Sequence, residues 1–136
     1  MTRRMPITYT VDHSRRLVIA KASGVFSDAD VFSYQHQAWS DPAVVGYNEL
    51  VDMTDITAID APNPVGARFS QLASLSSESD AVSSPAKFAI VAPSALAYAL
   101  GRAYQAYREM DTHSKKEVGV FRTLAEALGF LNISSL

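Results

Sequence analysis

Short apolar segments alternate with longer amphipathic segments along most of the chain, and their spacing predicts an α/β domain. Two β-type runs, residues 7–13 (ITYTVDH) and 16–24 (RLVIAKASG), predict a hairpin closed by a tight Ser-Arg turn. Three later runs are short and apolar in their middle, which is typical of buried strands. They are residues 48–53 (NELVDM), 87–92 (KFAIVA) and 117–121 (EVGVF).

Four helices are predicted from apolar residues spaced by three and four and from residues that begin or end helices. The first helix is expected to begin at Ser27 and to end at Pro42, and the second to begin at Pro62 and Pro64. The third is expected to run from Ser94 to about Met110, and the capping box of Thr123 and Glu126 begins the fourth. A Ser-rich connection, residues 76–85, follows the second helix. The order ββαβαβαβα predicts an α/β fold with a single mixed, mostly parallel sheet of five strands and an N-terminal hairpin, in one domain that covers residues 1–136.

The composition narrows the classes of function. The 136 residues are 48% hydrophobic and 19% charged, which is typical of one globular domain with one core. The net charge of -2 gives no global field that attracts nucleic acid, and the absence of cysteine excludes disulfides, thiolate metal sites and a cysteine nucleophile. No apolar run is long enough to span a bilayer and no apolar leader follows the first two arginines. We therefore expect a cytoplasmic protein without membrane insertion.

The most distinctive polar segment is VDMTDITAID, residues 51–60, which places three aspartates and two threonines directly behind a predicted strand. Carboxylates near the C-terminal end of a parallel strand are compatible with a magnesium or calcium site. The alternative is that Asp55 and Asp60 accept hydrogen bonds from backbone N–H groups in turns, with Asp60 leading into the next helix. We favour the alternative, because no D-x-D-x-D-G loop makes the carboxylates converge, and we expect no metal and no cofactor.

With this order of elements, the chain resembles the STAS-like group related to the sporulation anti-sigma-factor antagonist, often called SpoIIAA-like. The matching segments are RLVIAKASG, ELVDM, KFAIVAPSALAYALGRAYQAY and VFRTLAEALGFL, between residues 9 and 131. In phosphoregulated members, a D-S-S-G type turn follows the strand that matches ELVDM, and a partner kinase phosphorylates its serine. The resemblance places that turn on residues 60–63 (DAPN), which offer no hydroxyl. We therefore expect no phosphorylation there; Thr54 and Thr57, the nearest hydroxyls, both precede the acceptor position.

Catalytic chemistry finds little support in the sequence. The histidines are scattered, at His13, His36 and His113. Ser94 follows a predicted strand and opens a helix, but no G-x-S-x-G motif surrounds it, so a helix cap explains it better than a nucleophile. We expect no catalytic residue.

The long third helix offers a second candidate surface. It carries Tyr98, Tyr104 and Tyr107 together with Arg102 and Arg108, and tyrosine and arginine are common in protein interfaces. We expect its alanines to pack on the sheet, at positions 95, 99, 103 and 106. There is neither a glycine-rich phosphate loop nor a Lys/Arg cluster, so a nucleotide or nucleic-acid site is not expected.

These observations favour a non-enzymatic regulatory domain that binds a protein partner or associates with itself as a homodimer. The alternative is a carrier or sensor of a small apolar ligand, since lipid-carrying CRAL-TRIO domains share the broad fold; a hydrolase is a distant third. The predicted contact surface, called the strand-end surface below, combines residues 54–63 with residues 92–94 at the C-terminal ends of two parallel strands. Its candidate binding residues are Thr54, Asp55, Thr57, Asp60, Asn63 and Ser94, and the alternative interface is Arg102 with Tyr104.

Overall fold

The computed structural model describes residues 7–27, 30, 34, 37–38, 41–44, 46–60, 87–110 and 117–136. The strands are β1 (Ile7–Asp12), β2 (Leu17–Ser27), β3 (Asn48–Asp60), β4 (Lys87–Val91) and β5 (Glu117–Phe121). The helices are α3 (Ala95–Met110) and α4 (Leu124–Leu131), with the short 3-10 helix η1 (Pro42–Val44). The predicted second helix and the Ser-rich connection lie outside the described residues, as does most of the predicted first helix.

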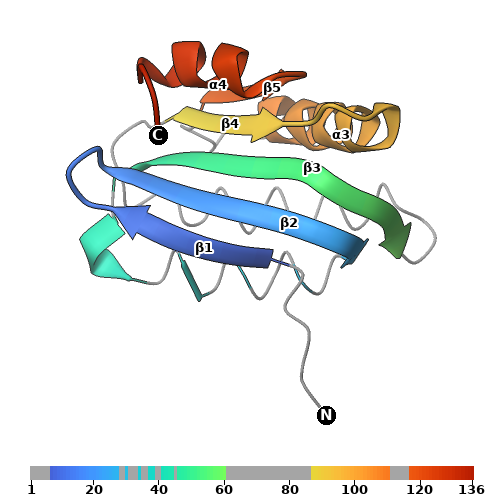
Figure 1. The fold of residues 1–136 in the computed structure, drawn as a ribbon, viewed down its shortest axis with the longest axis horizontal. Coiled ribbons are helices and arrows are strands. Elements are labelled where there is room, and N and C mark those ends of the chain that lie inside the picture. Colours follow the sequence, from blue (N-terminus) through green and yellow to red (C-terminus); the bar gives the residue numbers. More distant parts are fainter. Residues whose placement is uncertain are drawn as a thin grey trace.

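The five strands form one sheet in which the spatial order follows the chain, β1-β2-β3-β4-β5 (Figure 1). β1 pairs with β2 antiparallel, and each later pair is parallel. This confirms the predicted single mixed sheet with an N-terminal hairpin. Two of the four predicted helices, α3 and α4, are complete within the described residues.

The order of the strands decides which face of the sheet is covered. β2 to β5 are added in one direction, and the right-handed crossover from β4 to β5 places α3 on one face, called the inner face here. α3 packs on that face, and so do Tyr34 and Ala38 from the connection between β2 and β3. The inner-face core combines side chains from the sheet and α3, among them Ala20, Met53, Phe88, Ile90, Val118, Ala97, Leu100 and Tyr104.

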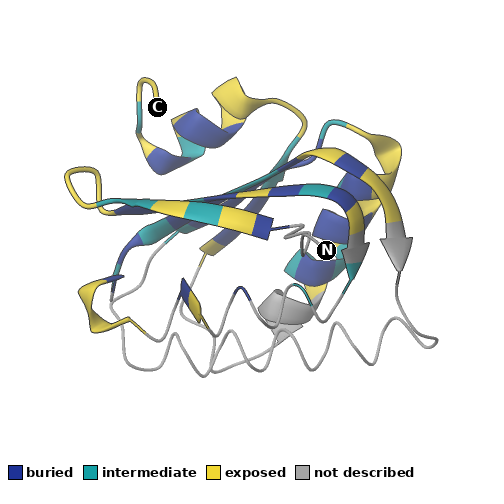
Figure 2. Cartoon of the chain, turned by 60° about the horizontal axis from the view of Figure 1, so that its bottom comes forward, coloured by how far each residue is buried: buried dark blue, intermediate teal, exposed yellow. Residues whose placement is uncertain are grey.

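The opposite face, called the open face, is covered only in part by the described residues. α4, which follows the last strand, lies on this side of the sheet, while α3 and η1 lie on the other (Figure 2). It buries Ala127, Leu128 and Leu131 against strand residues that include Leu17 and Val91. Towards the C-terminal half of β2 and over β1, the open face carries exposed side chains instead.

The starts of α3 and α4, and the end of β2 at Ser27, show the predicted capping chemistry. Ser27 and Asp30 exchange bonds in the manner of a capping box: the Asp30 N–H donates to Ser27 Oγ, and the Ser27 N–H donates to the Asp30 carboxylate. The Ala97 N–H donates to Ser94 Oγ at the start of α3. At α4 the Glu126 N–H donates to Thr123 Oγ1, whose hydroxyl donates back to the Glu126 carboxylate. The helix starts that the sequence predicted at Ser94 and Thr123 are confirmed.

The hairpin turn is longer than the predicted Ser-Arg pair. β1 ends at Asp12 and β2 begins at Leu17, so four residues form the turn. The Asp12 carboxylate accepts bonds from the Ser14 hydroxyl and from the N–H groups of Ser14 and Arg15. These bonds, and the charge of Arg15 3.0 Å away, hold the pKa of Asp12 below its ordinary value. Arg16 closes the turn in the left-handed region, with φ 52°.

The face of α3 that meets the sheet differs from the predicted one. Ala95, Ala99 and Ala106 are exposed, so the expectation that these alanines pack on the sheet was wrong. The side chains that face the sheet are those of Ala97, Leu100 and Tyr104, with Gly101 between them. Their spacing of three and four matches one turn of a helix, and it selects the stripe with the larger apolar side chains.

Candidate functional site

The polar segment of residues 51–60 is a strand along its whole length. β3 runs from Asn48 to Asp60, so the prediction that the strand ends at Met53 was wrong. β4 ends at Val91, opposite Asp52. Beyond that point, β3 pairs with β2 alone among the described residues, as far as Ser27 opposite Asp60. The two strands form a parallel ribbon that continues past the rest of the sheet (Figure 1).

The ladder between β2 and β3 has two irregularities, and the two threonines of residues 51–60 lie at them. Lys21 pairs with Asp52 and Ser23 with Asp55, so β3 holds one extra residue there. The N–H and hydroxyl of Thr54 donate to the Asp52 carboxylate, which gives this N–H a partner outside the ladder.

The second extra residue lies further along the ribbon. Gly24 pairs with Ile56 and Val25 with Ala58, which leaves Thr57 as the extra residue. Gly24 has φ 69°, a conformation that glycine adopts without a steric penalty. Thr54 and Thr57 therefore each lie in a β-bulge of β3.

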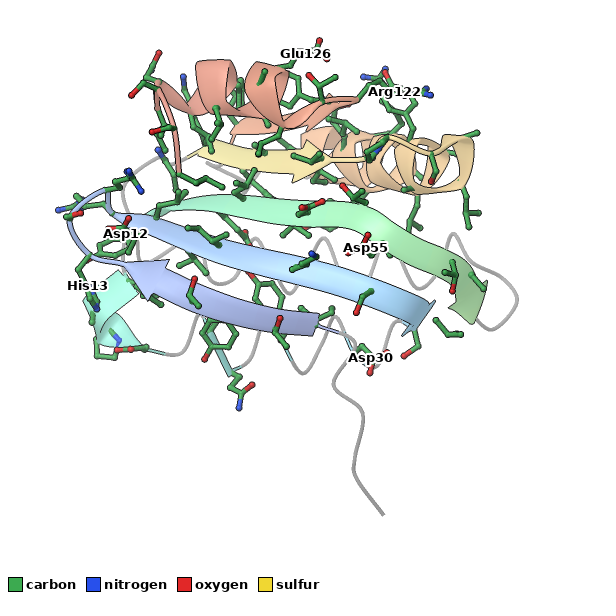
Figure 3. The ribbon with its side chains drawn as sticks, in the orientation of Figure 1. Asp12, His13, Asp30, Asp55, Arg122 and Glu126 are labelled. Atoms are coloured by element: carbon green, nitrogen blue, oxygen red, sulfur yellow. The ribbon has the colours of Figure 1, made fainter. Side chains whose placement is uncertain are left out.

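The second aspartate, Asp55, lies on the open face (Figure 3). Its carboxylate accepts a bond from Lys21 Nζ at 3.0 Å, and the side chains of Asp55 and Lys21 are 53% and 57% exposed. The hydrogen bond to Asp55 and the negative charges of Asp55 and then Asp52 raise the pKa of Lys21 above its ordinary value, against a smaller effect of desolvation. The prediction that Asp55 accepts backbone bonds in a turn was wrong, because its partner is a lysine on the neighbouring strand.

The arrangement of these carboxylates bears on the cation hypothesis. Asp52 accepts from Thr54, and Asp55 pairs with Lys21. Across the part of the chain that the structure describes, no three His, Asp or Glu side chains come together as a metal-binding group. The Asp55 carboxylate therefore already has a cationic partner in the Lys21 ammonium.

The exposed part of the open face extends over the ribbon and β1. Val25 is 51% exposed, and Ala58, its partner across the ladder, is exposed as well. Together with the ion pair, the exposed side chains of this face are Thr8, Thr10, Lys21, Val25, Asp55 and Ala58. Sequence reasoning missed Lys21, Val25 and Ala58. Lys21 and Val25 are an even number of positions apart along one strand, which predicts that they share a face. Only the register with β3 shows which residues lie beside them.

Four of the residues predicted for the strand-end surface are exposed in the structure. Thr54, Asp55 and Thr57 are all exposed on β3. Ser94 is exposed too, and its segment leaves β4 next to β3, because Val91 pairs with Asp52. Asp60 is the last residue of β3. Asn63 lies outside the described residues.

The alternative interface is divided by burial. Arg102 is exposed and donates to Gln105 Oε1 at 2.7 Å. Tyr104 is only 6% exposed and packs edge-on against Phe88, with 5.7 Å between the ring centroids. Tyr104 therefore belongs to the core, and the expectation that it forms a contact surface with Arg102 was wrong.

Among the three histidines, His13 lies in the part of the chain that the structure describes, and it contacts Tyr47. The Nδ1 atom of His13 lies 2.8 Å from the Tyr47 hydroxyl, and the guanidinium of Arg16 stacks over the Tyr47 ring. This cluster lies at the N-terminal ends of β2 and β3, away from the strand-end surface. His36 and His113 are outside the described residues.

The comparisons with known proteins identify the fold. No family model matches the chain, and no curated protein matches it. A solved structure is similar over nearly the whole length: an uncharacterised protein of the DUF3478 family with a SpoIIAA-like fold, from Shewanella loihica. The two chains are 15% identical, with a TM-score of 0.58, and the match covers 96% of this chain and 98% of that one.

This likeness shows that the chain has a SpoIIAA-like fold, which confirms the fold that the sequence resemblance predicted. At this identity it shows the fold alone.

None of the helices in the described residues combines the length and the apolar character that a membrane span requires.

Proposed function

We propose that this protein is a non-enzymatic regulatory domain that binds a protein partner through the ribbon of β2 and β3. The observation that carries the proposal is the exposure of this ribbon on its open face. Parallel strands are usually covered on both faces, because crossover helices lie against them. Here Val25, Asp55 and Ala58 are exposed on a parallel pair whose other face is buried in the core.

The chemistry of the ribbon supports a protein as the partner. Val25 and Ala58 offer an apolar contact area, and Lys21 and Asp55 beside them form a neutralised pair. A mixture of apolar and polar groups, without an excess of one charge, is typical of protein interfaces that form and dissociate. A nucleic-acid site would instead gather lysine and arginine.

In the proposed function, binding of the partner is regulated without phosphorylation of the turn that phosphoregulated SpoIIAA-like proteins use. The turn that the family uses for phosphate corresponds to residues 60–63, directly at the end of β3, and it contains no hydroxyl. Thr54 and Thr57 lie upstream in the two bulges. Regulation would therefore come from the presence or conformation of the partner. Ser94 supports the non-enzymatic assignment, since its hydroxyl oxygen accepts from the Ala97 N–H as a helix cap.

The test uses a photoreactive amino acid placed at Val25, at Ala58 and, as a control, at Gly129. Gly129 is exposed on α4, and a Cβ atom there meets nothing within 4 Å, so the control tolerates a side chain equally well. In cells that naturally make the protein, irradiation should give one adduct of defined mass at Val25 and at Ala58, but not at Gly129. Asp55→Lys should abolish that adduct, because it places a second positive charge beside Lys21.

Two results would contradict the proposal. The first is an identical set of adducts at all three positions, which would mean that contacts are unspecific. The second is native mass spectrometry of the purified protein that finds a retained small apolar molecule while Val25 and Ala58 give no adduct. That pattern would support the carrier function instead.

A further inference from the structure

The two margins of the sheet differ in how they are protected. β5 forms one margin, where Gln105 Nε2 donates to the Val118 carbonyl at 2.8 Å and Glu117 is exposed. β1 forms the other margin, and among the described residues it pairs only with β2. An edge strand presents a row of backbone N–H and C=O groups that a further strand can pair with.

The first five of the six residues of β1 lack the features that usually prevent such pairing, and the charged Asp12 at its end is engaged in the hairpin turn with Ser14 and Arg15. Natural edge strands carry lysine, proline or a bulge that disfavours a new neighbour. Residues 7–11 read ITYTV, with no charge, no proline and no glycine. The six residues of β1 pair with β2 in an unbroken register, so the strand is regular along its length.

The same five residues are nearly symmetric about Tyr9. If two copies of β1 align antiparallel around Tyr9, Ile7 of each copy faces Val11 of the other, and Thr8 faces Thr10. Ile7, Tyr9 and Val11 share the inner face, and Thr8 and Thr10 are exposed on the open face. β-branched residues, aromatic pairs and Thr–Thr pairs are favourable neighbours across strands, so the strand is complementary to itself.

We propose that β1 pairs with β1 of a second copy, antiparallel and centred on Tyr9, to form a homodimer with one continuous sheet. The absence of charge in residues 7–11 means that two identical strands approach without repulsion. The two-fold axis runs perpendicular to the sheet, which is the symmetry that antiparallel pairing of identical strands requires. Both open faces then lie on the same side. This interface is separate from the ribbon of β2 and β3, so it does not depend on the proposed function.

The test exploits the predicted register through position 8, which faces position 10 of the other copy. Thr8 lies opposite Lys21 within the chain, so Thr8→Glu is compatible with the fold. The variant Thr8→Glu/Thr10→Lys places opposite charges across the proposed interface twice. The variant Thr8→Glu/Thr10→Glu differs from it only at position 10 and places like charges there twice. Circular dichroism establishes that both variants fold.

Sedimentation velocity from micromolar to millimolar concentration measures the association. The wild type and the Glu/Lys variant should reach twice the 14.7 kDa of the chain. The Glu/Glu variant should stay monomeric or dissociate with a Kd raised about tenfold or more. Amide exchange within residues 7–11 should slow as the wild-type concentration rises.

Three outcomes would overturn the proposal. A wild type that remains monomeric at millimolar concentration shows that β1 does not pair. Equal dimerisation of both double variants shows that the dimer uses another surface. Loss of the dimer in both variants shows that position 8 does not face position 10.

Discussion

Gly101 is the position where the packing of α3 on the sheet can be tested most directly. A Cβ atom added at Gly101 would lie 2.9 Å from Val120 Cγ1 and 3.5 Å from Ile90 Cγ2. The first distance is shorter than real Cβ contacts, while the second is an ordinary contact. Val120 is β-branched, so its χ1 angle has few alternatives with which to avoid the clash.

The expected effect of Gly101→Ala is the difference between two opposing contributions. Alanine favours the helix over glycine by about 1 kcal/mol. Forcing an extra methyl group into a well-packed contact costs about 1–3 kcal/mol. The net result is a loss of about 1 kcal/mol in the free energy of unfolding, or a fall of about 3 °C in Tm for a domain of this size.

Urea denaturation followed by circular dichroism measures the change, with an unchanged slope m as evidence that only stability is affected. Gly129→Ala is the matched control, since it has the same helix preference and no atom within 4 Å. It should stabilise the protein by about 0.5–1 kcal/mol. Val120→Ala should cost less in the Gly101→Ala background than in the wild type, because it relieves the clash. The reasoning is refuted if Gly101→Ala stabilises as much as Gly129→Ala does.

Three further predictions concern the polar groups. Tyr34→Phe removes the hydroxyl that donates to the buried Glu49 carboxylate, and it should lower the free energy of unfolding by about 1–2 kcal/mol in urea titration; no change would show that the bond does not matter. Because the folded pKa of Asp12 lies below its ordinary value of 3.8, its contribution to stability is present above that pH and is lost as pH falls through the folded pKa; an NMR titration of its carboxyl carbon with a midpoint at or above 3.8 would contradict this. Millimolar magnesium or calcium should leave Tm unchanged, and a saturable rise that Asp52→Asn abolishes would show that the carboxylates bind a cation after all.

Local patterns in the sequence predicted the strands and the helix starts well. The sheet pairs residues 7–12, 87–91 and 117–121 almost as the apolar runs indicate, and Thr123 caps α4 as its spacing to Glu126 requires. Such signals act over a few residues, so a single sequence contains them.

The second half of β3 escaped prediction for a physical reason. Met53 and Ile56 are both buried, but the extra residue between them changes their spacing from two to three. A bulge therefore hides the alternation by which strands are recognised. The ion pair of Lys21 and Asp55 was equally inaccessible, because it depends on the register of two strands that are distant in sequence.

The agreement between the order of strands in the sheet and their order in the chain has a consequence for biosynthesis. Each strand after the first lies beside the strand made just before it. A chain that leaves the ribosome can therefore extend its sheet one strand at a time, without leaving a gap for a segment that is still to be synthesised. Loop closure is then limited to the nearest strand, which keeps its entropic cost as low as parallel pairing permits. α4 follows β5 in the chain and buries apolar side chains on the open face of β4, so this strand stays partly exposed until α4 has been made.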